Sequence, residues 1–295
     1  MPLPVALLSD AKPSLCFLVT GATSQLGRAL LPMLHAQGQQ VIALSRDAHV
    51  GDDASAQWHR VDLAQGWPDV AGCDVGISFG PMQALAEALS ALQAAPFAQL
   101  VATSSMSAES KRDSLITVDR ELSAALRNAE AALIEQCERL GIAWTILRPT
   151  MIYGLGLDEN LSPIARRALQ TRVFPYPKGS GLRQPVHAED VALTALRAVS
   201  TASAQGRILE IGGGERLRVD DMFRRVCKGM PVWALPVPVP HGIQRLIAWL
   251  KPGLRGALSR VDQDLIADNT ALETLLGVKP RGFTPDVARW LEARS

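Results

Sequence analysis

The chain has 295 residues, of which 47% are hydrophobic and 20% charged, so its composition is that of a globular protein. Lysine and arginine number 30 against 29 acidic residues, and this balance gives no global field that would recruit nucleic acid or an anionic membrane. The four cysteines are far apart in the sequence and form no C-x-x-C pair, which indicates free thiols and argues against a zinc site.

A strand, a tight turn and a helix are predicted near the start of the chain. The apolar run at residues 15–19 ends in a small-residue turn, and an apolar stripe at helical spacing follows over residues 26–34. The glycines allow a sharp exit from the strand and close packing of the helix, whose free N–H groups then favour a phosphate. A turn with glycines kept for packing alone is the alternative. The residues that would hold a dinucleotide here are Gly21, Thr23, Ser24, Gln25, Leu26 and Gly27.

The end of the second predicted strand bears on the choice of dinucleotide. In NAD-binding folds an acid some ~20 residues past the glycines binds the ribose hydroxyls, and an arginine there suits the 2′-phosphate of NADP. Ser45 occupies the position of the acid and Arg46 follows it. A solvated arginine is the alternative, and Asp47 beside it weakens the case for a phosphate. We therefore predict NADP, with NAD as the other choice.

Strands predicted at residues 58–63, 75–79, 100–103 and 143–147 alternate with helices, which is typical of an α/β fold with a doubly wound parallel sheet. Ligands of such sheets lie at the carboxyl ends of the strands. Asp62 fits there either as a helix cap or as a neighbour of the adenine. The strand-end residues assigned to the cofactor are Asp62, Leu63, Gly80, Thr103 and Pro149.

The regular alternation ends near residue 156. We expect an N-terminal extension at 1–13, a dinucleotide-binding Rossmann core at 14–155, and a smaller substrate-side region at 156–295 that also completes the core sheet. Residues 243–250 are amphipathic, with their apolar side chains on one face. Such a stretch could lie on a membrane surface, but helices of this length more often close a core or a substrate lid.

These pieces, in this order, resemble the extended and atypical short-chain dehydrogenase/reductases, the NAD-dependent epimerase/dehydratase family. The resemblance implies a Rossmann-type fold and hydride transfer to or from a nicotinamide. The stretches that carry it are the turn Gly21 to Gly27, Val61-Asp62-Leu63, Thr103-Ser104-Ser105, Leu147-Arg148-Pro149 through Tyr153-Gly154, and Arg183 through Asp190.

The family's acid/base is a tyrosine, and a lysine four residues later on the same helix face lowers its pKa. The two tyrosines of this chain, Tyr153 and Tyr176, both lie outside the helix expected at 119–140. The resemblance puts Ser123 at the tyrosine position and Arg127 at the lysine position, where Arg127 can still bind a ribose of the cofactor. The usual mechanism is therefore missing.

Two residues are candidates for catalysis in place of that pair. Ser105 matches the family's catalytic serine, although a serine that caps its own strand end is an equal alternative. A lone histidine is more often structural, yet the unperturbed pKa of His187, near ~6.5, suits acid/base work. The residues that the resemblance assigns to the substrate are Ser105, Tyr153, Lys178, Arg183 and His187.

Two functions follow from these observations. The first is an oxidoreductase or epimerase that acts on a carbonyl or sugar-nucleotide substrate with a non-standard acid/base, and the intact substrate-side stretches favour it. The second is a non-catalytic NADP-binding redox sensor or assembly factor, which the missing tyrosine favours. We expect a small-molecule substrate, a homodimer as an option, no nucleic acid, no metal and no integral membrane segment. Because no run reaches ~18 apolar residues and residues 1–13 lack a basic signal-peptide start, we expect a cytoplasmic protein.

Overall fold

Seven parallel strands form the central sheet of the computed structural model, which describes residues 14–46, 56–70, 72–250, 256 and 258–292. The strand order, β11-β6-β5-β4-β1-β2-β3, reverses direction between β1 and β4, as in a doubly wound fold. The predicted fold class is confirmed. The strands are β1 (Cys16–Thr20), β2 (Gln40–Ser45), β3 (Gln57–Arg60), β4 (Val75–Ser78), β5 (Gln99–Thr103), β6 (Ala143–Pro149) and β11 (Arg207–Ile211).

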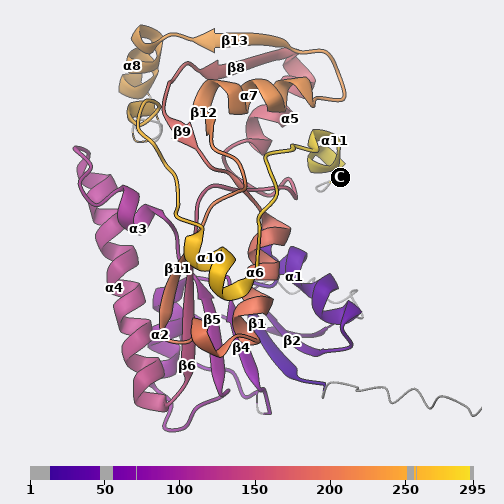
Figure 1. Ribbon diagram of the computed structural model, residues 1–295, viewed down its shortest axis with the longest axis vertical. Helices are drawn as coiled ribbons and strands as arrows, with labels where there is room; N and C mark the ends of the chain where they lie inside the picture. The colour runs from indigo at the N-terminus through magenta and orange to yellow at the C-terminus, as the bar shows by residue number, and fades with distance from the viewer. Residues whose placement is uncertain (1–13, 47–55, 71, 251–255, 257, 293–295) are drawn as a thin grey trace, which may run out of the picture.

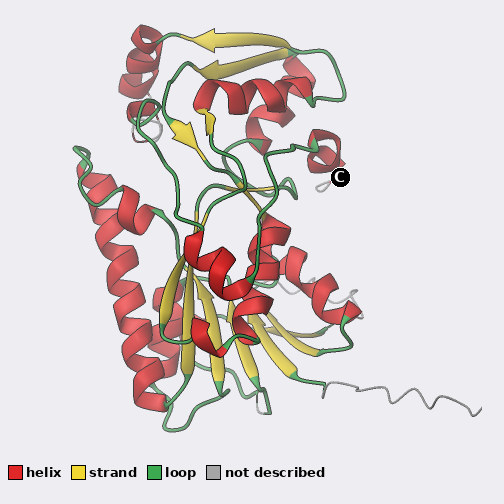
Figure 2. Ribbon diagram, in the orientation of Figure 1, coloured by secondary structure: helices red, strands yellow, loops and turns green. Residues whose placement is uncertain are grey.

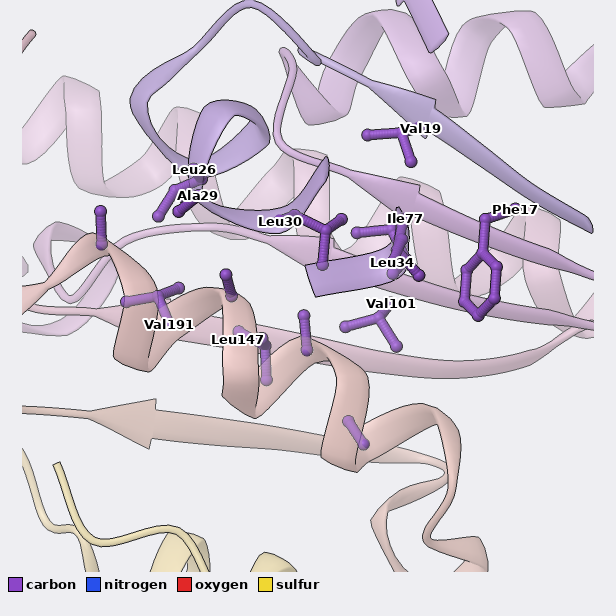
Figure 3. Packing of buried hydrophobic residues seen from close by; sticks show 14 of the residues in the cluster. Phe17, Val19, Leu26, Ala29, Leu30, Leu34, Ile77, Val101, Leu147 and Val191 are labelled. Carbon is purple, nitrogen blue, oxygen red and sulfur yellow. The ribbon is translucent and has the colours of Figure 1, made fainter. Parts of the chain in front are cut away.

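Helices cover both faces of the sheet (Figure 2), because alternate residues of its apolar strands point to opposite sides. Phe17 and Val19 of β1 join the cluster beneath α1 (Gln25–Ala36) and α6 (Ala188–Val199), which Figure 3 shows from close by. Leu18 joins the other cluster. The helices on that second face are α2 (Met82–Ser90) and α4 (Thr117–Leu140), with η1 (Leu63–Gln65) and α3 (Ser107–Ser110) beside them.

The second half of the chain builds a smaller part that lies over the carboxyl ends of the strands (Figure 1). Its core gathers Tyr153, Phe174, Phe283 and Trp290, all with 2% or less of their surface exposed. Three short strand pairs hold it together: β7 (Ile152–Tyr153) with β10 (Val186–His187), β8 (Val173–Pro177) with β13 (Leu235–Val239), and β9 (Leu182–Arg183) with β12 (Leu217–Arg218). The helices here are α5 (Ser162–Thr171), α7 (Val219–Lys228), α8 (His241–Leu250) and α11 (Val287–Glu292).

The later chain also returns to the sheet. Strand β11 pairs in parallel with β6, and α10 (Thr270–Leu276) and η2 (Ala202–Ala204) pack beside it. Within the described ranges, no helix is both long and apolar enough to cross a membrane. The four cysteines are free, and Cys16 and Cys73 bring their Sγ atoms to 3.9 Å of each other. Burial, foremost, raises the pKa of the Cys73 thiol to about 12, so the thiol and not the thiolate is the favoured form at neutral pH.

Candidate functional site

The turn between β1 and α1 depends on its two glycines. Gly21 has φ +65°, and a Cβ there would lie 2.7 Å from the carbonyl carbon of Phe79 in the loop after β4. A Cβ on Gly27 would lie 2.3 Å from the carbonyl oxygen of Ala22. Gly27 therefore lets the helix pack closely against the backbone of its own turn, at Ala22. The sequence predicts close packing of the helix on the sheet, whereas the nearest atoms belong to the turn.

The same turn presents backbone donors. The Oγ of Ser24 accepts the N–H of Gly27 at 3.2 Å and so caps α1. The N–H groups of Gln25 and Leu26 have no acceptor among the residues described, and the positive end of the helix dipole lies with them. An anionic group is favoured at such a helix start. The turn thus fits the phosphates of a dinucleotide.

The side chain of Gln25 ties the turn to the second half of the chain. Its Oε1 accepts the N–H groups of Leu155 and Leu157, each at 3.4 Å. Thr23 is half-buried, and its carbonyl accepts a hydrogen bond from Nε of Arg28 at 3.2 Å. The segment after β7 is therefore held against the start of α1.

The residues expected at the adenosine end lie at the ends of β2 and β3. Ser45 is buried as the last residue of β2, and Arg46 is exposed directly after it. Asp47, which weakens the case for a 2′-phosphate, lies outside the described residues. Asp62 accepts the N–H of Ala64 at 3.1 Å and caps η1, which begins at Leu63. The capping role of Asp62 is present, and its place beside the adenine stays a prediction.

Two hydroxyls at the end of β5 lack partners. The Oγ1 of Thr103 and the Oγ of Ser104 are buried and make no hydrogen bond within the part of the chain that the structure describes. Ser105, the expected catalytic serine, instead accepts the N–H of Ser107 at 3.1 Å and caps the turn into α3. Ser104 belongs to the motif Thr103-Ser104-Ser105, but nothing local in the sequence distinguishes its hydroxyl from those of its neighbours.

The neighbouring strand ends are closely packed. A Cβ on Gly80 would lie 3.3 Å from the Oγ1 of Thr20, which itself shares a buried 2.8 Å hydrogen bond with Ser78. Pro149 ends β6 and is buried, and its carbonyl accepts the N–H of Met106 at 3.0 Å. These contacts hold the ends of β1, β4, β5 and β6 at one edge of the sheet.

Helix α4 carries a serine and an arginine at the positions of the expected pair. Ser123 is fully buried and donates its hydroxyl to the carbonyl of Ala108 at 2.6 Å. Arg127 is half-buried, and its Nε donates to the carbonyl of Ser123 at 3.4 Å. The serine hydroxyl is therefore already bonded within the protein, and its match to the family's tyrosine position stays a prediction.

Arg148 links three elements beneath this edge. It bonds both carboxylate oxygens of Glu130 on α4, at 2.9 and 2.5 Å, and reaches Glu109 on α3 at 2.7 Å. The hydrogen bond with Glu130 raises the pKa of Arg148 above its ordinary value. Arg148 is one of the residues that carry the family resemblance, but the sequence alone suggests no role for it. Its contacts fix α3 and α4 against β6.

Tyr153 and His187 lie side by side on the paired strands β7 and β10, with ring centroids 5.1 Å apart. The hydroxyl of Tyr153 donates to the carbonyl of Gly282 and accepts the N–H of Thr284, both at 3.3 Å. Burial, foremost, raises the pKa of this phenol. With its ring in the core and its hydroxyl bonded, Tyr153 has the contacts of a packing residue, and its assignment to the substrate stays a prediction.

His187 caps a helix. Its Nδ1 accepts the N–H of Glu189 at 3.2 Å, at the start of α6, and a Cβ on Gly154 would lie 2.3 Å from its Nε2. Burial, followed by the positive charge of Arg281, lowers the pKa of His187 below its ordinary value. The imidazole is therefore neutral at neutral pH, which suits a base and not an acid.

The expected phosphate-binding cations differ in their surroundings. Lys178 is exposed, whereas Arg183 is buried and donates to the carbonyls of Gln263 at 2.6 Å and Arg260 at 2.8 Å. Burial, and then the charge of Arg260, lower the pKa of Arg183 to about 10. Arg260 lies beside Arg183 and was not among the cations that the sequence assigned to the substrate. Its Nε is buried without a partner in the described ranges, while another of its nitrogens binds Asp119 of α4.

A family model described as NAD(P)H-binding matches residues 21–201. The chain belongs to this NAD(P)H-binding family. The match begins in the turn before α1 and continues through α6, so it includes five of the seven sheet strands, β2 to β6. The predicted dinucleotide class is therefore confirmed at the level of NAD(P). Among the described residues there is no group of three or more His, Cys, Asp or Glu side chains that could hold a metal ion.

Relatives of this NAD(P)H-binding chain point the same way. It is 24% identical over 177 residues to a UDP-glucose 4-epimerase of Vibrio cholerae; this match covers 57% of the chain and spans about half, 52%, of that epimerase. A mutant UDP-glucuronic acid 4-epimerase from Bacillus cereus, solved with UDP-4-deoxy-4-fluoro-glucuronic acid and NAD, has a TM-score of 0.72 at 15% identity, over 95% of this chain and 99% of that one.

A second solved structure has the same fold. An NAD-dependent NDP-hexosamine 5,6-dehydratase gives a TM-score of 0.69 at 14% identity, over 95% of this chain and 97% of its own. At such identities the solved structures establish the shared fold alone. Together with the family match, they confirm the resemblance to the extended short-chain dehydrogenase/reductases.

Proposed function

We propose that this protein is an NADP-dependent oxidoreductase or epimerase that acts on a carbonyl or sugar-nucleotide substrate without the Tyr–Lys pair. The observation that carries the proposal is the pair of unpartnered hydroxyls of Thr103 and Ser104 at the end of β5. A buried polar group without a partner costs about 1–3 kcal/mol. A carbonyl or sugar hydroxyl bound at this edge of the sheet would supply the missing partners.

The residues of the turn fit the cofactor. The N–H groups of Gln25 and Leu26 would hold its phosphates, Arg46 its 2′-phosphate, and Arg127 a ribose. When bound, the nicotinamide supplies the hydride acceptor or donor. The protein's part is to place the substrate carbon near it and to keep water out, as Phe79 and Gly80 of the loop after β4 pack against the turn.

A sugar-nucleotide substrate is supported by cations of the second half. Arg183 and Arg260 lie next to each other, and Arg260 keeps a buried, unpartnered Nε. Guanidinium groups bind phosphate oxygens well because their donors match the geometry. The relatives and solved structures with this fold include proteins named for UDP-sugars, which is the same chemistry.

The acid/base is the open part of this proposal. His187 is the candidate base, since its lowered pKa leaves it neutral, with Ser105 as the other candidate. Both side chains also serve as caps, and the hydroxyl of Ser123 is bonded inside the protein. Those three contacts favour the second function, a non-catalytic NADP-binding sensor or assembly factor.

Absorbance of the reduced nicotinamide separates the two. We would load the purified protein with NADP or NAD, add UDP-glucose, UDP-glucuronic acid or simple carbonyls, and follow 340 nm absorbance and sugar epimers. An enzyme should change either the absorbance or the proportion of sugar epimers, and a sensor should change neither. Thr103→Val should lower turnover at least tenfold without loss of stability, because its hydroxyl bonds nothing in the protein. Thr194→Val is the matched control, since that buried hydroxyl is satisfied by Asp190 in its own helix.

A further inference from the structure

Helix α8 is packed with its apolar face outward. Its one fully buried side chain is the polar Gln244, which donates from Nε2 to the carbonyls of Lys178 and Val239, both at 2.8 Å. The sequence favours a stretch that closes a core or a lid, and the structure differs. The apolar side chains on the opposite face are exposed: Ile243 51%, Leu246 55%, Trp249 77% and Leu250 62%.

This exposed helix lies in a stretch without acidic residues. After Asp221 the next carboxylate in the sequence is Asp262. Of the seven cations between them, three form ion pairs with carboxylates elsewhere: Arg224, Arg225 and Arg260. The cation on α8 itself is Arg245, which is exposed. Lys251 and Arg255 follow the helix in the sequence and lie outside the described residues. Asp262 accepts hydrogen bonds from the N–H and Oγ of Ser180, and its other carboxylate oxygen lies 3.8 Å from Nδ1 of His241 on α8. Arg245 forms no ion pair with a described residue, so α8 exposes one unpaired cation beside its apolar face.

The helix stands at one end of the molecule. Figure 1 shows α8 and β13 at the end farthest from the lower edge of the central sheet. Trp233, 74% exposed, and Leu235, 48% exposed, lie at the other end of β13. A cavity of about 490 Å³ beside α8 is lined by Arg245, Trp249 and Leu258, and also by His241 and the carboxylate of Asp262. Aromatic, aliphatic and cationic groups therefore share one end of the chain's fold.

A second copy of the chain fits this end poorly. A ten-residue helix is about 15 Å long and 10 Å wide, so its face is on the order of 150 Å², well below the ~800 Å² that each partner of a stable complex buries. The edge of β13 offers no alternative, because its outward N–H positions are Pro236 and Pro238.

We propose that the exposed face of α8 binds the surface of an anionic lipid bilayer. Tryptophan and leucine side chains with flanking cations are the composition of helices that lie in the membrane interface. Anionic headgroups would pair with Arg245, which is exposed and forms no ion pair with any residue that the structure describes. The protein would touch the membrane with this end and keep its sheet and dinucleotide turn in water.

Sedimentation with vesicles tests the proposal on the full chain. Vesicles of phosphatidylcholine are compared with vesicles that also contain phosphatidylglycerol. The parent should bind the anionic vesicles at least fivefold more tightly, and less so at high salt. Leu246→Glu should remove binding, and Arg245→Glu should weaken it on anionic vesicles by about fivefold or more. Leu115→Glu is the matched control, because Leu115 is 98% exposed between α3 and α4.

Each outcome decides the matter once thermal melts show that the variants fold as the parent does. Binding by the parent and by Leu115→Glu, with loss in Leu246→Glu, supports the proposal. Equal binding to both kinds of vesicle, no binding to either, or binding unchanged in Leu246→Glu overturns it. Sedimentation equilibrium measures the oligomeric state and tests the remaining alternative. If the parent is a dimer that Leu246→Glu dissociates, and the parent does not bind vesicles, the exposed face of α8 belongs to a contact with a second copy.

Discussion

Asp119 of α4 and Arg260 after α8 form an ion pair across 141 residues of sequence, with side chains that are only 7% and 10% exposed. Lys111 binds the other carboxylate oxygen at 3.2 Å. The pair joins a helix on the sheet to the last quarter of the chain. Burial alone would raise the pKa of Asp119, but the hydrogen bond and charge of Arg260, with Lys111, lower it below its ordinary value.

Asp119→Asn should lower the free energy of unfolding by about 3–5 kcal/mol, because two cations lose their carboxylate in a buried place. Urea denaturation at pH 7 measures this loss in the free energy of unfolding. Since the folded pKa is lowered, the contribution is present above about pH 4 and lost as the pH falls further. Arg112→Gln is the control. Its pair with Glu109 is exposed and should cost under about 1 kcal/mol. Equal losses in both variants would contradict the account.

The turn before α1 gives a second prediction. Gly27→Val should abolish dinucleotide binding, because its Cβ would stand 2.3 Å from the carbonyl oxygen of Ala22 and force the turn open. Ser24→Gly should bind nearly as the parent does and lose only a few tenths of a kcal/mol of helix stability. Calorimetric titration with NADP and NAD measures binding. Gly242→Ala is the control, because nothing lies within 4 Å of a Cβ there. A folded Gly27→Val protein that still binds would mean that the cofactor lies elsewhere.

The parts of this fold that could be predicted are those that depend on residues close together in the sequence. Gly21 and Gly27 frame a turn whose backbone needs them, and apolar runs such as residues 75–79 can hardly be anything but buried strands. The structure ends that strand at Ser78, one residue earlier. The βα alternation predicts a parallel, doubly wound sheet, but the order of its strands is known from the structure alone.

The site residues were harder because their partners are remote in sequence. Tyr153 is satisfied by Gly282 and Thr284, and Arg183 by Arg260, contacts that no local pattern reveals. The role of the amphipathic stretch 243–250 stayed open for a similar reason. Periodicity identifies an apolar face, but only the fold shows that Gln244 turns inward and leaves that face uncovered.

The choice between NADP and NAD rests on Arg46. The side chain is exposed beside the end of β2, where the 2′-phosphate of NADP is expected. A charge-assisted contact there is worth roughly 1.5–3 kcal/mol, so the parent should bind NADPH more than tenfold more tightly than NADH. Arg46→Ala should remove most of that preference and leave NADH binding unchanged. Arg28→Ala, on α1, controls for the loss of a nearby cation. Equal affinities in the parent, measured by calorimetry, would reject NADP and keep the nucleotide site.

His187 gives the last prediction, because one substitution separates its two roles. Asparagine is a good N-cap residue, so His187→Asn keeps an acceptor for the N–H of Glu189 while removing the imidazole. Burial and Arg281 lower the folded pKa of His187, so protonation favours the unfolded chain. The parent should therefore lose stability as the pH falls below about 6.5, and His187→Asn should lose less. Urea denaturation between pH 7.5 and 5 tests that part.

Turnover tests the other role of His187. If His187 is the base, His187→Asn should lower turnover by about 10²- to 10⁴-fold while NADPH affinity is unchanged. His59→Asn is the control histidine, on β3 at the far edge of the sheet. A capped, stable His187→Asn protein with full turnover would assign the proton transfer to another group, and Ser105 would be next. A parent without turnover on any substrate, but with the predicted pH dependence of stability, would leave His187 as a cap and favour the sensor.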